Sequence, residues 1–188
     1  MKIITTIILT LAAVALIGII YMYSGVYDVS VQNRDKGITK WILETTMDNS
    51  VEHHAKNIVA PALDDSAMIW KGFTHYDRMC GCHSDPGEKM RPSRYEPHPP
   101  PLYRTADDWK PNELFWIIKN GIKMSAMPAF GMRSSDDEIW SIVAFLKYFP
   151  KMPIDQFNAW QDKVRMEMQL RMMQRQQEMQ KQQQKKRN

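Results

Sequence analysis

The residues with the most distinctive chemistry form one short run, Met79-Cys80-Gly81-Cys82-His83. Two thiols and an imidazole this close together can bind a soft metal ion, or can attach a single haem through two thioethers and an iron bond. The haem-attachment sequence is Cys-x-x-Cys-His, in which two residues separate the cysteines. Here Gly81 alone separates them. The run by itself therefore leaves haem attachment, a soft-metal site and two unrelated thiols all open.

A second group of residues supplies a soft ligand further along the chain. The segment 121–131 reads Gly-Ile-Lys-Met-Ser-Ala-Met-Pro-Ala-Phe-Gly, so that Met127 directly precedes Pro128. A thioether held in a proline-containing loop suits the sixth coordination position of a low-spin, electron-transfer haem. Met124 competes for this role, and ordinary core packing is the alternative interpretation of Met127.

The composition limits what else the chain can be. It has 188 residues, of which 44% are hydrophobic and 24% charged, so one domain with a packed core is expected. Two cysteines exclude a disulfide-rich scaffold and any four-cysteine zinc or iron–sulfur site made by this chain alone. A net charge of +4 is too small to indicate nucleic-acid binding.

Three helices joined by loops are predicted in residues 64–150, and no alternating strand pattern or internal repeat occurs there. The class is therefore all-α. A proline-rich loop separates the first two helices. Asp64 and Asp65 can cap the first helix, which reaches Met79. Pro111 opens the second helix, which reaches Lys119 and ends before Gly121. The capping box Ser135 to Glu138 starts the third helix.

In their order along the chain, these motifs resemble class I c-type cytochromes, particularly the single-domain, membrane-anchored bacterial ones. The resemblance runs from Gly72 to Pro150 and implies a cytochrome c fold, with three main helices around one covalently bound haem c. It is carried by Gly72-Phe-Thr-His-Tyr76, Cys82-His83, His98-Pro-Pro-Pro101, Glu113-Leu-Phe-Trp-Ile-Ile-Lys-Asn-Gly121, Met127-Pro-Ala-Phe-Gly131 and Ser135-Asp-Asp-Glu-Ile-Trp-Ser-Ile-Val-Ala-Phe145.

The resemblance also implies roles for individual residues. His83 is the expected proximal iron ligand and Met127 the distal one. A carbonyl of the Pro99–Pro101 stretch is expected to accept a hydrogen bond from His83 Nδ1, which would fix the ring and its tautomer. Gly72 and Tyr76 are expected where the first helix crosses the last, against Trp140 or Phe145.

The two cysteines depart from the family pattern. Counting from Gly72 and Tyr76 makes Cys80 the first attachment thiol, whereas counting back from His83 makes Cys82 the second. Both registers hold, so one residue is missing between them. We therefore expect a thioether at Cys82, and a second one at Cys80 only if the chain tightens locally. No catalytic residue is expected.

An N-terminal anchor is predicted in residues 1–23. Ile3 to Met22 is a run without a charge, long enough to span a hydrocarbon core of roughly 30 Å. A cleaved signal peptide is the alternative, since Ala13-Val14-Ala15 has the small-x-small form. A cytoplasmic N-terminus is favoured because the cysteine motif needs an exported location, which puts the soluble domain in the periplasm, at a bacterial inner membrane.

Residues 24–63 form a connecting segment. Ile38, Trp41, Ile42, Val51 and Ile58 follow near-helical spacing. They predict one amphipathic helix, ended by Pro61, lying against the soluble domain or against the membrane surface. Histidines outside the motif receive no ligand role: His53 and His54 are assigned to a solvated or interface face, with a second metal as the alternative, and His75 to the surface.

Residues 151–188 form a basic extension rich in Met and Gln. Nine Lys or Arg and four Asp or Glu give it +5, which leaves −1 for the rest of the chain. The absence of Gly and Pro from 156–184 predicts a long helix, with Phe157, Trp160, Val164 and Met168 on one apolar side. Contact with a partner helix is favoured for its methionines. Copper binding and a solvated tail are the alternatives.

These inferences together predict a membrane-anchored mono-haem cytochrome that carries single electrons between respiratory partners and is not itself an enzyme. A haem-bearing accessory subunit of a larger membrane oxidoreductase complex is the first alternative. A ligand-binding or peroxidatic haem protein is the second, and it requires Met127 to be weak or absent as a ligand.

Overall fold

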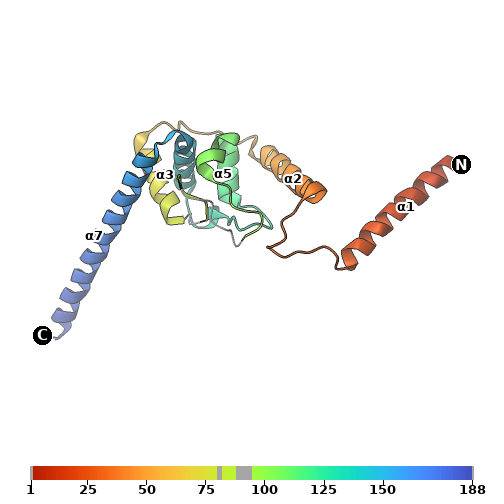
Figure 1. Ribbon diagram of the computed structural model, residues 1–188. Helices are drawn as coiled ribbons and strands as arrows, with labels where there is room; N and C mark the ends of the chain where they lie inside the picture. The colour runs from red at the N-terminus through yellow and green to blue at the C-terminus, as the bar shows by residue number, and fades with distance from the viewer. Residues whose placement is uncertain (1, 80–81, 88–94, 188) are drawn as a thin grey trace.

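The computed structural model describes residues 2–79, 82–87 and 95–187, which contain helices, turns and loops but no β-strand (Figure 1). The all-α prediction is confirmed for this part of the chain. In chain order the α-helices are α1 Lys2–Tyr23, α2 Gly37–Ala55, α3 Ser66–Met79, α4 Leu102–Thr105, α5 Pro111–Asn120, α6 Asp136–Tyr148 and α7 Ile154–Arg187, and the 3₁₀ helices are η1 Ala106–Asp108, η2 Phe130–Met132 and η3 Phe149–Lys151.

The three predicted helices of the domain begin and end where local chemistry indicates. The Asp65 carboxylate accepts a hydrogen bond of 3.0 Å from Ala67 N at the start of α3. Ser135 and Glu138 form the predicted capping box of α6. Gly121, with φ +69°, ends α5 in a conformation that residues with a side chain rarely adopt.

The helices α3 and α6 cross at very short range. A Cβ at Gly72 would lie 1.8 Å from the backbone oxygen of Ser141, so only glycine permits this approach. The ring of Tyr76 lies 5.2 Å from that of Phe145, which confirms the predicted crossing and selects Phe145 as the neighbour. Trp140 instead stacks on Phe115 at 4.2 Å, joining α6 to α5.

The helix α2 ends earlier than the sequence indicated. It stops at Ala55 and not at Pro61. The reason is a competing set of hydrogen bonds: the Ala55 carbonyl accepts from Asn112 Nδ2 at 2.8 Å and from Ile58 N at 2.9 Å. Ala55 is fully buried, so α2 finishes against α5.

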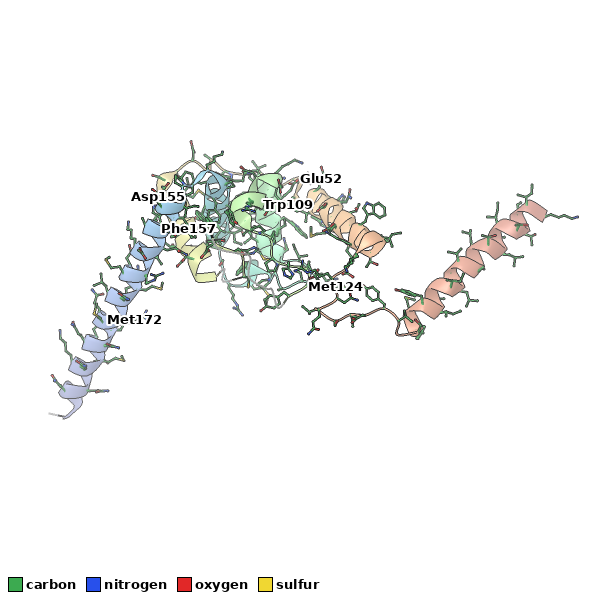
Figure 2. The ribbon with its side chains drawn as sticks, viewed as in Figure 1. Glu52, Trp109, Met124, Asp155, Phe157 and Met172 are labelled. Carbon is green, nitrogen blue, oxygen red and sulfur yellow. The ribbon has the colours of Figure 1, made fainter. Side chains whose placement is uncertain are left out.

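The long helix α7 starts inside the domain core. Phe157 and Val164 are almost completely buried, and Trp160 packs edge-on against Trp70 of α3 at 5.1 Å. Beyond Val164 the helix runs away from the body, with Met172 on the projecting part (Figure 2). The predicted apolar side of this helix is confirmed for Phe157, Trp160 and Val164. Their partner is the chain's own core.

The helix α1 stands at the other end of the molecule. It has 22 residues, none of them buried, and an 18-residue stretch within it has a mean hydropathy of 2.8. Its side chains project freely on all sides in Figure 2. By length and composition α1 is long and apolar enough to cross a membrane. A signal sequence near the N-terminus would meet the same two criteria.

Candidate functional site

The predicted proximal ligand lies on the short segment that follows α3. His83 Nδ1 lies 2.7 Å from the carbonyl oxygen of Pro100. The loop that carries Pro100 leads directly into α4, where Leu102 and Tyr103 pack against the core. The expected hydrogen bond from the imidazole to the Pro99–Pro101 stretch is therefore present, and it connects His83 to the packed interior.

This contact determines the tautomer of His83. A carbonyl oxygen can only accept, so Nδ1 carries the hydrogen and Nε2 carries the lone pair. Burial lowers the pKa of the His83 imidazole, although the bond to Pro100 acts in the opposite direction. A neutral ring held by a carbonyl, with Nε2 as the electron-pair donor, is the form of histidine that binds iron.

Of the two cysteines, the structure describes one. Cys82 lies in the turn directly before His83, as an exposed free thiol. Cys80, predicted as the less secure attachment residue, lies outside the described residues. The placement of Cys82 beside the imidazole fits a thioether at this position.

The predicted distal ligand lies on a loop that folds back on the end of α5. Ile122 N donates to the Met127 carbonyl at 3.1 Å, and Met127 N donates to Ser125 Oγ at 3.1 Å. A Cβ at Gly121 would lie 2.7 Å from the Met127 oxygen, so the loop closes tightly over that glycine. The backbone of Met127 is thereby held on both sides.

The two candidate methionines differ in burial and in backbone conformation. Met127 is half-buried and packs against the hydrophobic core, whereas Met124 is 84% exposed. Met124 also has a positive φ of 58°, which is uncommon for a residue with a side chain. These differences favour Met127 as the residue that presents its thioether inward.

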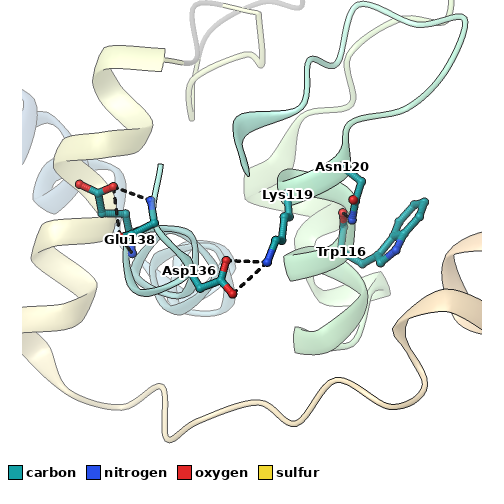
Figure 3. A network of polar contacts seen from close by, with 6 residues as sticks. Trp116, Lys119, Asn120, Asp136 and Glu138 are labelled. Atoms are coloured by element: carbon teal, nitrogen blue, oxygen red, sulfur yellow. Dashed lines mark hydrogen bonds and ion pairs between the residues drawn. The ribbon is translucent and has the colours of Figure 1, made fainter. Parts of the chain in front are cut away.

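A polar contact joins the end of α5 to the start of α6, the two helices between which this loop runs. Lys119 Nζ donates to both carboxylate oxygens of Asp136, at 2.7 and 2.9 Å (Figure 3). A Cβ at Gly131 would lie 2.9 Å from the Lys119 carbonyl. The loop carrying Met127 is thus closed by close backbone contacts at both of its glycines.

Residues that sequence reasoning left without a role join the proximal loop to the connecting segment. His98 Nε2 lies 2.6 Å from Arg34 Nη2, and His98 Nδ1 lies 3.3 Å from Glu96. Arg34 belongs to the stretch between α1 and α2. No sequence signal could have paired residues 64 positions apart, and only the folded chain brings them together.

The remaining histidines do not gather into a second metal site. His53 and His54 are exposed, and the ring of His54 lies against Trp116 at 5.4 Å. His75 lies 3.9 Å from the Glu138 carboxylate and is only partly exposed, which differs from the predicted surface position. Within the part of the chain that the structure describes, no group of three or more His, Cys, Asp or Glu side chains could hold a metal ion.

The donor set can be tested against the cofactor that the motifs imply. His83 supplies a neutral nitrogen donor, Met127 a thioether sulfur on a firmly held loop, and Cys82 a thiol beside the imidazole. One imidazole, one thioether and covalent thioether attachment suit a c-type haem. Three such ligands would be a poor set for zinc, which prefers several thiolates or imidazoles.

A comparison with protein families decides the class of the domain. Residues 67–146 match the family described as cytochrome C oxidase, cbb3-type, subunit III. Residues 67–146 form a c-type cytochrome domain. Such a cytochrome domain implies covalently bound haem c and a role in electron transfer. No curated protein and no solved structure gives a match to the chain.

Proposed function

We propose that this protein is a membrane-anchored, mono-haem c-type cytochrome that carries single electrons between respiratory partners at the periplasmic face. The observation that carries the proposal is the bond from His83 Nδ1 to the Pro100 carbonyl, which leaves Nε2 as the donor. The closed loop around Met127 supplies the second donor.

The residues that would hold the cofactor are Cys82, His83 and Met127, with Cys80 as a second covalent attachment only if the chain tightens locally. A bound haem c would supply a one-electron couple between ferric and ferrous iron. The chain's own task is to present His83 in one tautomer and to keep Met127 in place. Because His83 and Met127 would both bind the iron, no position on it would be left for a substrate, so a carrier and not an enzyme is proposed.

The proposed location rests on α1. Its exposed apolar side chains need a partner, and a bilayer core of roughly 30 Å matches a helix of 22 residues. Export of the following domain is proposed because covalent haem attachment through thiols needs the exported compartment. Intact mass would show whether residues 1–23 remain on the mature chain, which separates an anchor from a cleaved signal peptide.

Matched methionine variants test the ligand assignment. Met127→Ala is expected to abolish the sulfur-to-iron charge-transfer band of the oxidised protein, whereas Met124→Ala keeps it. Loss of the band in Met124→Ala alone would assign the ligand to Met124. Absence of the band in the unmodified protein would instead support the ligand-binding or peroxidatic alternative. A pyridine haemochrome spectrum then distinguishes one thioether, at Cys82, from two.

A second candidate function is a haem-bearing subunit of a larger membrane oxidoreductase complex. The family description that matches residues 67–146 names an oxidase subunit, and the outer part of α7 exposes methionines such as Met172 and Met173. Partner capture by the full chain and by a chain ending after residue 165 tests this. Cutting there keeps Val164 in the core. Equal capture by both chains would refute an assembly role for the outer part of α7.

A further inference from the structure

An apolar patch lies on the first half of α2. Ile38, Trp41 and Ile42 are 71%, 63% and 48% exposed. They occupy positions i, i+3 and i+4, so they share one face of the helix. Three large side chains left in water on one face indicate a surface that another apolar medium covers.

The second half of the same helix is fixed to the cytochrome domain. Val51 and Ala55 are 1% and 0% exposed, and Asn112 of α5 donates to the Ala55 carbonyl at 2.8 Å. The ring contact of His54 with Trp116 adds to this attachment. The helix therefore leaves the domain as a rigid extension, and its exposed patch has a fixed orientation relative to the site.

The chain also keeps the patch near the end of α1. Residues 24–36 separate the two helices and reach at most about 45 Å when fully extended. If α1 spans a bilayer, one membrane surface is always within that reach. Lys36 lies directly before α2 and is exposed, whereas Lys40 lies on the opposite face from the patch and 3.6 Å from Glu44. The charge of Lys36 suits anionic lipid headgroups.

We propose that Ile38, Trp41 and Ile42 insert into the surface of the bilayer that α1 crosses, with Lys36 at the headgroups. This inference rests on the proposed membrane anchor. A helix lying in the interface buries its apolar face by about 5–10 Å at the boundary of headgroups and acyl chains. Because the other half of α2 is part of the domain, this seating sets the orientation of the haem site above the membrane.

The same helix contains a matched control. Leu43 is 47% exposed, nearly the same as its neighbour Ile42, but it lies on a different face from the patch. A change at Leu43 alters hydrophobicity and charge as much as a change at Ile42. Only Ile42 should affect contact with lipid.

The experiment uses the full haem-loaded chain in vesicles of phosphatidylcholine and phosphatidylglycerol that carry bromine on their acyl chains. A fluorescent non-canonical residue replaces Ile38 in one sample and Leu43 in another. The probe at position 38 is expected to shift to shorter wavelength and to be quenched by the bromines. The probe at position 43 should do neither. With the probe at position 38, Ile42→Glu should remove most of the quenching and Leu43→Glu should not.

Equal quenching at positions 38 and 43 would overturn the proposal. So would shielding of position 38 that depends on protein concentration and is insensitive to the bromines, because a second copy of the chain would then cover the patch. Equal quenching in phosphatidylcholine alone would overturn the role of Lys36. Flotation of the vesicles after a high-salt wash tests α1 separately. A chain that floats without quenching refutes the seating of α2 alone, whereas one that does not float refutes the anchor as well.

Discussion

The close crossing of α3 and α6 allows a quantitative prediction for Gly72→Ala. The added Cβ would lie 1.8 Å from the Ser141 oxygen, 2.5 Å from the Ser141 carbonyl carbon and 2.9 Å from Phe145 Cβ. Two of these three atoms belong to the backbone of α6, so no side-chain rotation can relieve the contact. The helices α3 and α6 must move apart by more than 1 Å to reach ordinary van der Waals distance, which begins at 3.4 Å.

The magnitude follows from two opposed effects. Alanine in place of glycine favours the helix by about 1 kcal/mol. Overpacking of a well-packed core typically costs about 1–3 kcal/mol, and more where backbone must move. Since separating α3 from α6 also loosens Tyr76 against Phe145, the cost lies at the upper end of that range. The difference between this cost and the helix preference of alanine is about 2 kcal/mol, so Gly72→Ala should lower the free energy of unfolding by about that amount.

Denaturant unfolding of the full chain in detergent, followed by circular dichroism, measures this change. Lys71→Ala is the control, because Lys71 is the exposed neighbour of Gly72 on α3 and should change stability by less than about 0.5 kcal/mol. A Gly72→Ala variant as stable as the unmodified protein would refute the reasoning, since the two helices could not then be as close as described.

Three further changes test other contacts. Val164→Ala should lower the free energy of unfolding by about 1–2 kcal/mol because it opens a cavity in the core, whereas Met172→Ala on the exposed part of α7 should have little effect in the same denaturant assay. A hydrogen bond from the Ser135 backbone, the largest cause, lowers the pKa of Glu138 below its ordinary 4.5. The ionised Glu138 carboxylate therefore stabilises the folded state above pH 4.5, and this stabilisation is lost as the pH falls through the lowered pKa of the folded state. The free energy of unfolding of Glu138→Gln should thus depend less on pH below 4.5 than that of the unmodified protein. Asn112→Ala removes the bond to the Ala55 carbonyl and should speed hydrogen exchange in α2 by a factor of about 5–10, as expected for a loss of about 1 kcal/mol; unchanged exchange would show that α2 is held by other contacts.

Helix boundaries in the domain were predictable because their causes are local. Ser135 with Glu138, Asp65 with Ala67, and Gly121 at a positive φ each act within a few residues of their own position. Local signals failed where a distant residue intervened. The end of α2 depends on Asn112, which belongs to α5 and has no sequence relation to Ala55.

The site divides in the same way. The resemblance of the chain to c-type cytochromes predicted the hydrogen-bond partner of His83, and the structure has the expected bond to the Pro100 carbonyl. Whether Gly72 and Tyr76 contact Trp140 or Phe145 depends on how α6 is rotated about its own axis against α3. The apolar periodicity of α6 does not determine that rotation closely enough to choose between the two residues. The contact of His98 with Arg34 depends on how the connecting segment returns to the domain, and no local pattern specifies that path.

The connecting segment and the C-terminal extension each lie partly inside the domain, and the size of the domain explains why. A helical core of residues 64–150 alone buries a modest share of its surface, and small domains are correspondingly marginal. The buried end of α2, at Val51 and Ala55, and the buried start of α7, at Phe157 and Val164, extend that core on two sides. The other half of each helix is then held rigidly by the half that is packed. The cytochrome domain therefore sets the angle at which each exposed half projects. For this reason the patch on α2 should be tested by substitution and the methionines of α7 by cuts after residue 165. Removing either whole segment would also remove part of the core.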